Sequence, residues 1–208
     1  NTKGLTSKEV MLGIQPLANQ TARYGTYWQE YNSMAMYTAM PSFMSLIEND
    51  PRKDWMLIAQ KRYNDPTLTD YGIVKGISGN KKEESIAIRL TEMYLLKAEA
   101  IVLSGGKLED AKNLLKTVSG HAGITDFSVI DAITNRDELR LEIYKKNNKN
   151  LIFEDGIEWT AMTRLPLEEI LKIKPAIKEY NYTILPIPAT EFEKNPTIGS
   201  QNPGYSKI

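Results

Sequence analysis

The feature that most constrains the fold is a pair of helical patterns joined by two glycines. Apolar residues recur at helical spacing on both sides of Gly105-Gly106. A glycine after the last apolar turn supplies the left-handed conformation that ends many helices. The pattern therefore predicts a helical hairpin over residues 86–118. The apolar positions are Leu90, Met93, Tyr94, Ala98 and Ile101 before the glycines, and Leu108, Ala111, Leu115 and Val118 after them.

Such a hairpin needs something to pack against. The small side chains of Ala98 and Ala100 allow its two helices to approach closely, as in tetratricopeptide units. A single unit of this kind does not bury its apolar face alone. We therefore expect partners for the hairpin, either elsewhere in the chain or in a segment outside it.

The remaining patterns predict short elements and a loop-rich layer. We expect strands at residues 8–14, 54–63 and 71–77, a long loop at 19–40 and a short helix from Pro41, ended by the turn Asn49-Asp50-Pro51. We expect a third helix at 128–147, broken near Asn135 and supported by a Glu142–Lys146 pair, a short helix containing Trp159, and an extended tail with one helical turn at 190–194. The fold class is thus mainly α, leaning to α+β, with few short strands.

Composition and charge exclude several classes of function. The 26 basic and 26 acidic side chains cancel, so no net field attracts nucleic acid or an anionic membrane. Cysteine is absent, which rules out disulfides and thiolate chemistry. No apolar run reaches the roughly 18 residues of a membrane span. The chain opens on Asn1 without an export signal, so we expect a mature or shortened form of a longer protein.

Five sequence blocks, taken in order, are similar to one known family. They are Glu9 to Ile14, Asn49-Asp50-Pro51-Arg52, Arg89 to Ala100, Phe153-Glu154-Asp155-Gly156 with Trp159 and Arg164, and the close from Pro186-Ile187-Pro188 through Asn195-Pro196 to Gln201-Asn202-Pro203-Gly204-Tyr205. Each block is weak alone, but together they span nearly the whole chain. The chain resembles the C-terminal half of a SusD/RagB-family protein.

The resemblance implies a fold, a function and partners. It implies non-catalytic binding of a glycan or similar nutrient, and delivery to a SusC-like TonB-dependent transporter. It places the protein on the outer-membrane surface of a Bacteroidetes-type bacterium, held by a lipid anchor outside this chain. We expect residues 1–85 to form a central loop- and strand-rich region, and residues 86–208 the hairpin and C-terminal region, together one domain. The family is typically about twice as long.

One block departs from the family pattern. Where the family has a Glu-Arg-Arg cluster, this chain has Tyr144-Lys145-Lys146 followed by Asn147-Asn148. Asparagine competes with the backbone for hydrogen bonds and is a poor helix former. The substitution therefore predicts that the helix ends there and that the local ion-pair network is altered.

An aromatic and polar stretch is the leading candidate for a binding site. Its rings are able to stack on the apolar faces of sugars, while neighbouring polar groups bond to hydroxyls. The alternative is that these aromatics cover the core, with their polar atoms satisfied at its boundary. The candidate residues are Arg23, Tyr24, Tyr27, Trp28, Tyr31, Asn32 and Tyr37. Trp55 is a weaker candidate that we expect to serve packing, and we expect Trp159 to belong to the core.

No catalytic or metal constellation is predicted, and no cofactor. The carboxylate pairs Asp137/Glu138 and Glu154/Asp155 are sequence neighbours, which point in different directions rather than into one cleft. His121 is the only histidine and is expected at a surface or helix end. The rival interpretation from another class is a tetratricopeptide-like scaffold that docks a protein and has no small-molecule site.

Overall fold

A computed structural model of the chain describes residues 4–14, 34–35, 38–62, 64–73, 85–152, 154, 156–195 and 197–206, and its fold is mainly α-helical. The helices are α2 (Pro41–Leu46), α3 (Lys53–Met56), α4 (Leu90–Leu103), α5 (Leu108–His121), α6 (Ser128–Asp131), α7 (Arg136–Leu151), α8 (Ile157–Met162), α9 (Leu167–Ile173) and α10 (Ala189–Lys194). The strands are β1 (Val10–Ile14), β2 (Met34–Ala35), β3 (Leu57–Arg62), β4 (Thr69–Ile73) and β5 (Ser85–Arg89), with 3-10 turns η1 (Gly4–Thr6) and η2 (Tyr180–Thr183). The chain divides into two compact units, Asn1–Glu158 and Trp159–Ile208.

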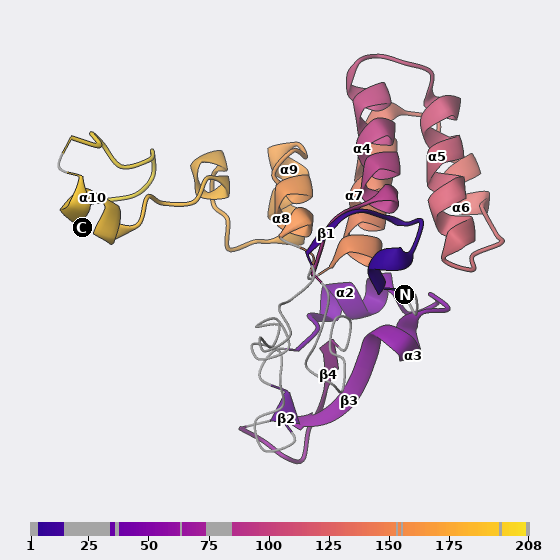
Figure 1. The fold of residues 1–208 in the computed structure, drawn as a ribbon, viewed down its shortest axis with the longest axis horizontal. Coiled ribbons are helices and arrows are strands. Elements are labelled where there is room, and N and C mark those ends of the chain that lie inside the picture. The colour runs from indigo at the N-terminus through magenta and orange to yellow at the C-terminus, as the bar shows by residue number, and fades with distance from the viewer. Residues whose placement is uncertain are drawn as a thin grey trace. The chain divides into compact units, whose positions relative to one another are not determined.

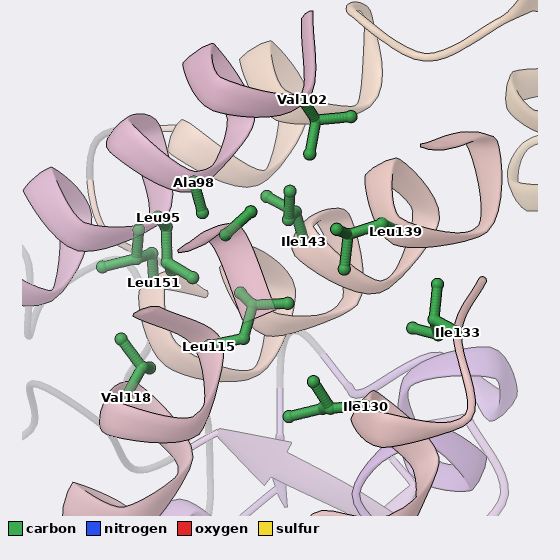
Figure 2. Packing of buried hydrophobic residues seen from close by; sticks show 11 residues of the cluster. Leu95, Ala98, Val102, Leu115, Val118, Ile130, Ile133, Leu139, Ile143 and Leu151 are labelled. Atoms are coloured by element: carbon green, nitrogen blue, oxygen red, sulfur yellow. The ribbon is translucent and has the colours of Figure 1, made fainter. Parts of the chain in front are cut away.

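The core of the first unit is a three-helix arrangement. The helices α4 and α5 form the predicted hairpin, and α7 packs against both (Figure 1). Side chains from the three helices point toward one another in the interior, as Figure 2 shows. Leu95, Leu115 and Leu139 are fully buried there, one from each helix. On α5 the predicted apolar positions Ala111, Leu115 and Val118 are buried in this core. On α4 the prediction was wrong in part: the core positions are Leu95, Ala98 and Val102, of which only Ala98 was predicted, and Leu90 is exposed.

Both helices of the hairpin end in the same glycine motif. After α4, the amide of Gly106 donates to the carbonyl of Ile101 at 2.8 Å, and Gly105 has φ 82°. After α5, the amide of Ile124 donates to the carbonyl of Ser119 at 3.0 Å, and Gly123 has φ 83°. These bonds satisfy carbonyls that a helix end otherwise leaves open.

Arg136, the first residue of α7, closes the end of α4. Its guanidinium donates to the carbonyl of Val102 at 3.0 Å, and to those of Gly105 and Gly106 at 2.9 Å each. A cation at this place also complements the partial negative charge of the helix C-terminus. The side chain thus ties the third helix to the hairpin turn.

Two small sheets accompany the helices in the first unit. β1 pairs antiparallel with β5, with Gly13 opposite Ile86. In the second sheet the order is β2-β3-β4. There β3 and β4 are antiparallel, with Ala59 opposite Tyr71, whereas β2 and β3 are parallel. A second apolar cluster joins α2, α3 and the start of β3 to the residue after α7; its members are Phe43, Ile47, Met56, Leu57 and Ile152.

The structure corrects three boundaries predicted from the sequence. Residues 85–89 form β5, so the first hairpin helix begins at Leu90 rather than at 86. Lys53–Met56 is helical, so the strand predicted from residue 54 begins at Leu57. The expected helix end at Asn147-Asn148 is wrong, because α7 continues to Leu151.

Asparagine side chains explain why α7 continues. The amide of Asn147 donates to the carbonyl of Ile143 at 3.1 Å, and that of Asn150 to the carbonyl of Lys146 at 2.7 Å. These bonds reach back one turn and leave the helical ladder intact. The predicted break near Asn135 is confirmed, since α6 ends at Asp131 and the Asn135 side chain caps α7. The Glu142–Lys146 pair is also present, at 3.5 Å.

The second unit contains short helices, and its C-terminal segment is held by side-chain hydrogen bonds. The side chain of Gln201 accepts from the amide of Ile187 at 2.7 Å and donates to the same residue's carbonyl at 2.8 Å. Asn202 donates to the carbonyl of Leu185 at 2.8 Å. The rings of Tyr182 and Tyr205 meet edge to face, with centroids 5.6 Å apart. The closing block of the sequence therefore holds the Pro186-Ile187-Pro188 segment by side-chain bonds.

Candidate functional site

A network of ion pairs lies where β1, the start of α4 and the end of α7 meet. Arg89 is at its centre: Nε donates to one carboxylate oxygen of Glu154 at 2.6 Å and Nη2 to the other at 3.0 Å. Nη1 donates to Glu9 at 3.1 Å, and Nη2 also donates to the backbone carbonyl of Asn150. The Glu9 carboxylate further accepts from the amide and hydroxyl of Thr91. One guanidinium thus joins three segments distant in sequence.

A second ion pair, between Arg52 and Asp50, also bonds to Asn150. Arg52 donates to both oxygens of Asp50, at 2.8 and 2.9 Å, and its third nitrogen donates to the side-chain oxygen of Asn150 at 2.7 Å. The Asp50 side chain is fully buried and Asn150 is 6% exposed. We call the set Glu9, Asp50, Arg52, Arg89, Thr91, Asn150 and Glu154 the polar junction.

In the polar junction, the carboxylates of Asp50 and Glu9 favour their ionised form. Burial is the largest influence on Asp50 and raises its pKa, but the bonds and charge of Arg52, with the charge of Lys149, outweigh it and leave the pKa below the usual value. For Glu9, burial likewise raises the pKa, and the Thr91 bonds with the Arg89 charge bring it below the usual value. An acid kept ionised and fully bonded is suited to holding structure rather than to transferring protons.

Four of the five sequence blocks meet at the polar junction. Glu9, Arg52, Arg89 and Glu154 each come from a different block. The sequence indicated each block separately but not their convergence. It also missed Asn150, which lies outside every block and joins the two ion-pair groups. No local pattern marks such a residue, because its partners are 61 and 98 positions away.

Trp55 lies three residues after Arg52 of the polar junction, and its side chain is exposed. It belongs to α3, which follows the Asp50-Pro51-Arg52 turn directly, and its neighbour Met56 is 1% exposed in the second apolar cluster. Trp55 itself is 61% exposed. The expected packing role is therefore wrong. An exposed indole on a fixed support is a surface on which a sugar ring or another apolar face can stack.

The leading aromatic candidates lie outside the described residues. This applies to Arg23, Tyr24, Tyr27, Trp28, Tyr31, Asn32 and Tyr37. β1 ends at Ile14, before these residues, and β2 lies between Asn32 and Tyr37 and pairs with Lys61 and Arg62 of β3. The site that these seven residues predict stays a prediction.

The other residues considered from the sequence have plain structural settings. His121 is exposed and is the last residue of α5, as expected. Trp159 is half-buried rather than in the core, with the Lys174 ammonium 5.0 Å from its ring centroid. Asp137 is exposed at the start of α7, and Glu154 is bonded to Arg89. Asp155 lies outside the described residues.

Two features are absent from the described residues, a helix that could span a membrane and a cluster suited to a metal ion. None of the helices in this part of the chain has the length and hydropathy of a membrane span. The same residues bring no three histidine, cysteine or acidic side chains together in a way that suits a metal ion.

Comparison with known proteins identifies the family. The sequence model of the SusD family matches residues 17–164. The fold is similar to a SusD superfamily protein of Bacteroides fragilis NCTC 9343 (TM-score 0.71, 19% identity, 99% of this chain and 53% of that one). It is also similar to one of Bacteroides thetaiotaomicron VPI-5482 (TM-score 0.71, 21% identity, 95% and 49%) and to B. fragilis NanU (TM-score 0.57, 17% identity, 96% and 51%).

These solved structures are about twice as long as the part that this chain matches. Among curated proteins, none matches the sequence. The identities are low, so the structural likeness speaks for the fold, while the match of the family model over most of the chain speaks for descent. The chain belongs to the SusD family.

Proposed function

We propose that this chain is part of a non-catalytic protein that binds a glycan, or a comparable nutrient, at the outer-membrane cell surface. The observation that carries the proposal is the family match over residues 17–164. In this proposal the protein passes its ligand to a SusC-like TonB-dependent transporter. The exposed indole of Trp55 supports the proposal, because glycan binding needs aromatic rings that reach solvent.

Two regions are proposed to contact the ligand. The first is the aromatic stretch with Arg23, Tyr24, Tyr27, Trp28, Tyr31, Asn32 and Tyr37. The second is Trp55 of α3, the short helix that follows Arg52, whose guanidinium donates to Asn150 at 2.7 Å. A rigid support lowers the entropy that binding costs. We therefore expect Trp55 to contribute to affinity even though it lies on a short helix.

Calorimetry against a panel of plant and host glycans tests the proposal. We expect at least one glycan to bind, and Trp28→Ala or Trp55→Ala to weaken it at least tenfold. Trp159→Ala is the matched control, because it removes an indole that already contacts Lys174. Unchanged affinity in both variants would remove these two residues from the site. If no glycan binds the chain at all, glycan binding by these 208 residues is contradicted.

Location and delivery need separate measurements. Surface exposure is tested by adding proteinase K to intact cells of the native host, where we expect the protein to be degraded while a periplasmic marker survives. Association with a transporter is tested by purifying the tagged protein from detergent-solubilised outer membranes. Protection of the protein in intact cells would contradict the cell-surface location.

A further inference from the structure

One face of the β3–β4 hairpin carries an exposed tyrosine. β3 and β4 lie side by side in Figure 1, and their register puts Tyr71 opposite Ala59. Residues opposite each other in an antiparallel pair share a face of the sheet. The methyl group of Ala59 is too small to cover a neighbouring ring, and Tyr71 is 39% exposed. The tyrosine side chain therefore reaches solvent from a strand that is paired with β3.

The two polar side chains beside Tyr71 on this face have no partner in the described part of the chain. Lys61 and Thr69 are opposite each other in the register, two residues from Ala59 and from Tyr71. Since side chains alternate along a strand, both lie on the face that carries Tyr71. Both residues are exposed, and among the described residues neither the ammonium nor the hydroxyl makes a hydrogen bond or an ion pair. The ring thus has donors beside it that are free to bond to a ligand.

On the opposite face of the hairpin, the charged groups are paired with each other. There Arg62 donates to both carboxylate oxygens of Asp70, at 2.8 Å each. The first face differs, because it presents a ring together with two unpaired donors. A sugar matches this combination, since its ring has an apolar C–H face and its edge carries hydroxyl oxygens that accept hydrogen bonds.

The Tyr71 face also belongs to strands that are bonded to the aromatic stretch of the proposed binding site. β2 lies inside that stretch and pairs with Lys61 and Arg62 of β3. Two residues after Tyr37, the last candidate of the stretch, the amide of Ala39 donates to the carbonyl of Tyr71 at 2.7 Å. Both the strand inside the stretch and the residue that follows it are therefore bonded to the hairpin.

We propose that Tyr71, Lys61 and Thr69 form a sugar subsite, in which one sugar ring of the bound glycan stacks on Tyr71 and its hydroxyl groups accept from Lys61 and Thr69. The subsite rests on the proposed glycan-binding function and adds to it a place on the β3–β4 hairpin that the sequence did not indicate. Tyr71 supplies the stacking surface, and the two donors select for hydroxyl groups at the edge of the sugar ring. Because the tyrosine is held on a paired strand, its backbone loses little freedom on binding.

Calorimetry with the tightest-binding glycan of the plant and host panel tests the subsite. We expect Tyr71→Thr, which removes the ring and keeps a residue favoured in strands, to weaken binding by about fivefold or more. Tyr71→Phe keeps the ring and should recover most of the lost affinity. Lys61→Met should weaken binding by about threefold or more, because it removes the ammonium donor.

Two variants are matched controls for these substitutions. Tyr180→Ala removes a 51% exposed tyrosine of the second unit, and Ile58→Ala shortens an exposed side chain on the opposite face of β3. Both should leave the affinity within about twofold of that of the unmodified chain. A loss in the Ile58 variant equal to that of Tyr71→Thr would overturn the subsite, because it would show that the hairpin and not the Tyr71 face is needed.

Nuclear magnetic resonance of the unmodified chain measures the contact without relying on a variant that folds. With isotopically labelled tyrosine rings, we expect the Tyr71 signals, assigned by their loss in Tyr71→Phe, to shift when the glycan is added, and the Tyr180 signals to stay. If the Tyr71 signals do not shift, or if Tyr71→Thr binds as tightly as the unmodified chain, the subsite is overturned while glycan binding stands. If no glycan of the panel binds the unmodified chain, the proposed function and the subsite are both overturned.

Discussion

Asn150 links the two ion-pair groups of the polar junction, because it bonds to both Arg52 and Arg89. Its side chain accepts from Arg52 and donates to the carbonyl of Lys146, while its own carbonyl accepts from Arg89. Each guanidinium therefore has an oxygen of Asn150 as well as its carboxylate partner. Buried cations are costly unless their donors are satisfied, so a neutral acceptor at this position complements two cations at once.

Removal of the Asn150 side chain should be costly. We expect Asn150→Ala to lower the free energy of unfolding by about 1–3 kcal/mol, because a donor of Arg52 loses its partner at a part-buried position. Urea unfolding followed by far-ultraviolet circular dichroism measures this. The control is Asn113→Ala on the exposed side of α5, where the change should be within about 0.5 kcal/mol. Equal stability of both variants would show that the polar junction does not stabilise the fold.

The polar junction also predicts how stability depends on pH. The pKa of Asp50 is lowered in the folded chain, so its ion pair contributes fully above the unfolded-state pKa of about 3.9 and is lost as the pH falls through the folded pKa. Glu9 acts in the same direction. We expect the free energy of unfolding to decrease as the pH falls below about 4. Asp50→Asn should be less stable at pH 6, with a smaller difference from the unmodified chain at pH 3.

Asp137→Asn is the control for this pH effect. Asp137 has a side chain 84% exposed and a long 3.8 Å contact to Arg140, so its substitution should leave the pH profile unchanged. The attribution to Asp50 fails if Asp50→Asn and the unmodified chain lose stability in parallel on acidification.

At the scale of elements, alanine substitutions at Gly105 and Gly120 are expected to change stability in opposite directions. Gly105 has φ 82° at the end of α4, whereas Gly120 lies inside α5, where an added Cβ would be 3.9 Å from the Phe127 ring. We expect Gly105→Ala to destabilise by about 1–2 kcal/mol, because alanine is strained at that backbone conformation. Gly120→Ala should stabilise by about 0.5–1 kcal/mol, since alanine favours a helix interior. Thermal unfolding of the two variants decides, and shifts of the same sign would contradict this account of the helix ends.

Helices were predictable where the evidence for them is local. Apolar spacing and Gly105-Gly106 predicted α4 and α5, and the break predicted near Asn135 lies where the side chain of this residue caps α7. Failures came where tertiary contacts decide. Residues 85–89 are a strand because β1 lies beside them. The helix α7 continues past Asn147-Asn148, where Asn147 and Asn150 bond back one turn and Asn150 also accepts from Arg52.

At the scale of the whole molecule, the family was predictable and the candidate site was less so. The ordered blocks predicted the SusD family, and four of the five contribute a residue to one tertiary junction. The exposure of Trp55 was not predictable, since whether an indole faces solvent depends on what packs around α3. The seven aromatic and polar candidates and the division near residue 85 stay predictions.

The charge balance of the whole chain predicts how ligand affinity depends on salt concentration. Basic and acidic residues number 26 each, so there is no net field to attract an anionic ligand. If binding rests on stacking against aromatic rings, affinity for a neutral glycan should be the same within twofold at 50 and 500 mM NaCl, although the Debye length falls well below 10 Å over this range. Calorimetry at the two salt concentrations measures it. An affinity that falls severalfold with salt would instead indicate an acidic ligand held by local cations, and would contradict recognition by stacking alone.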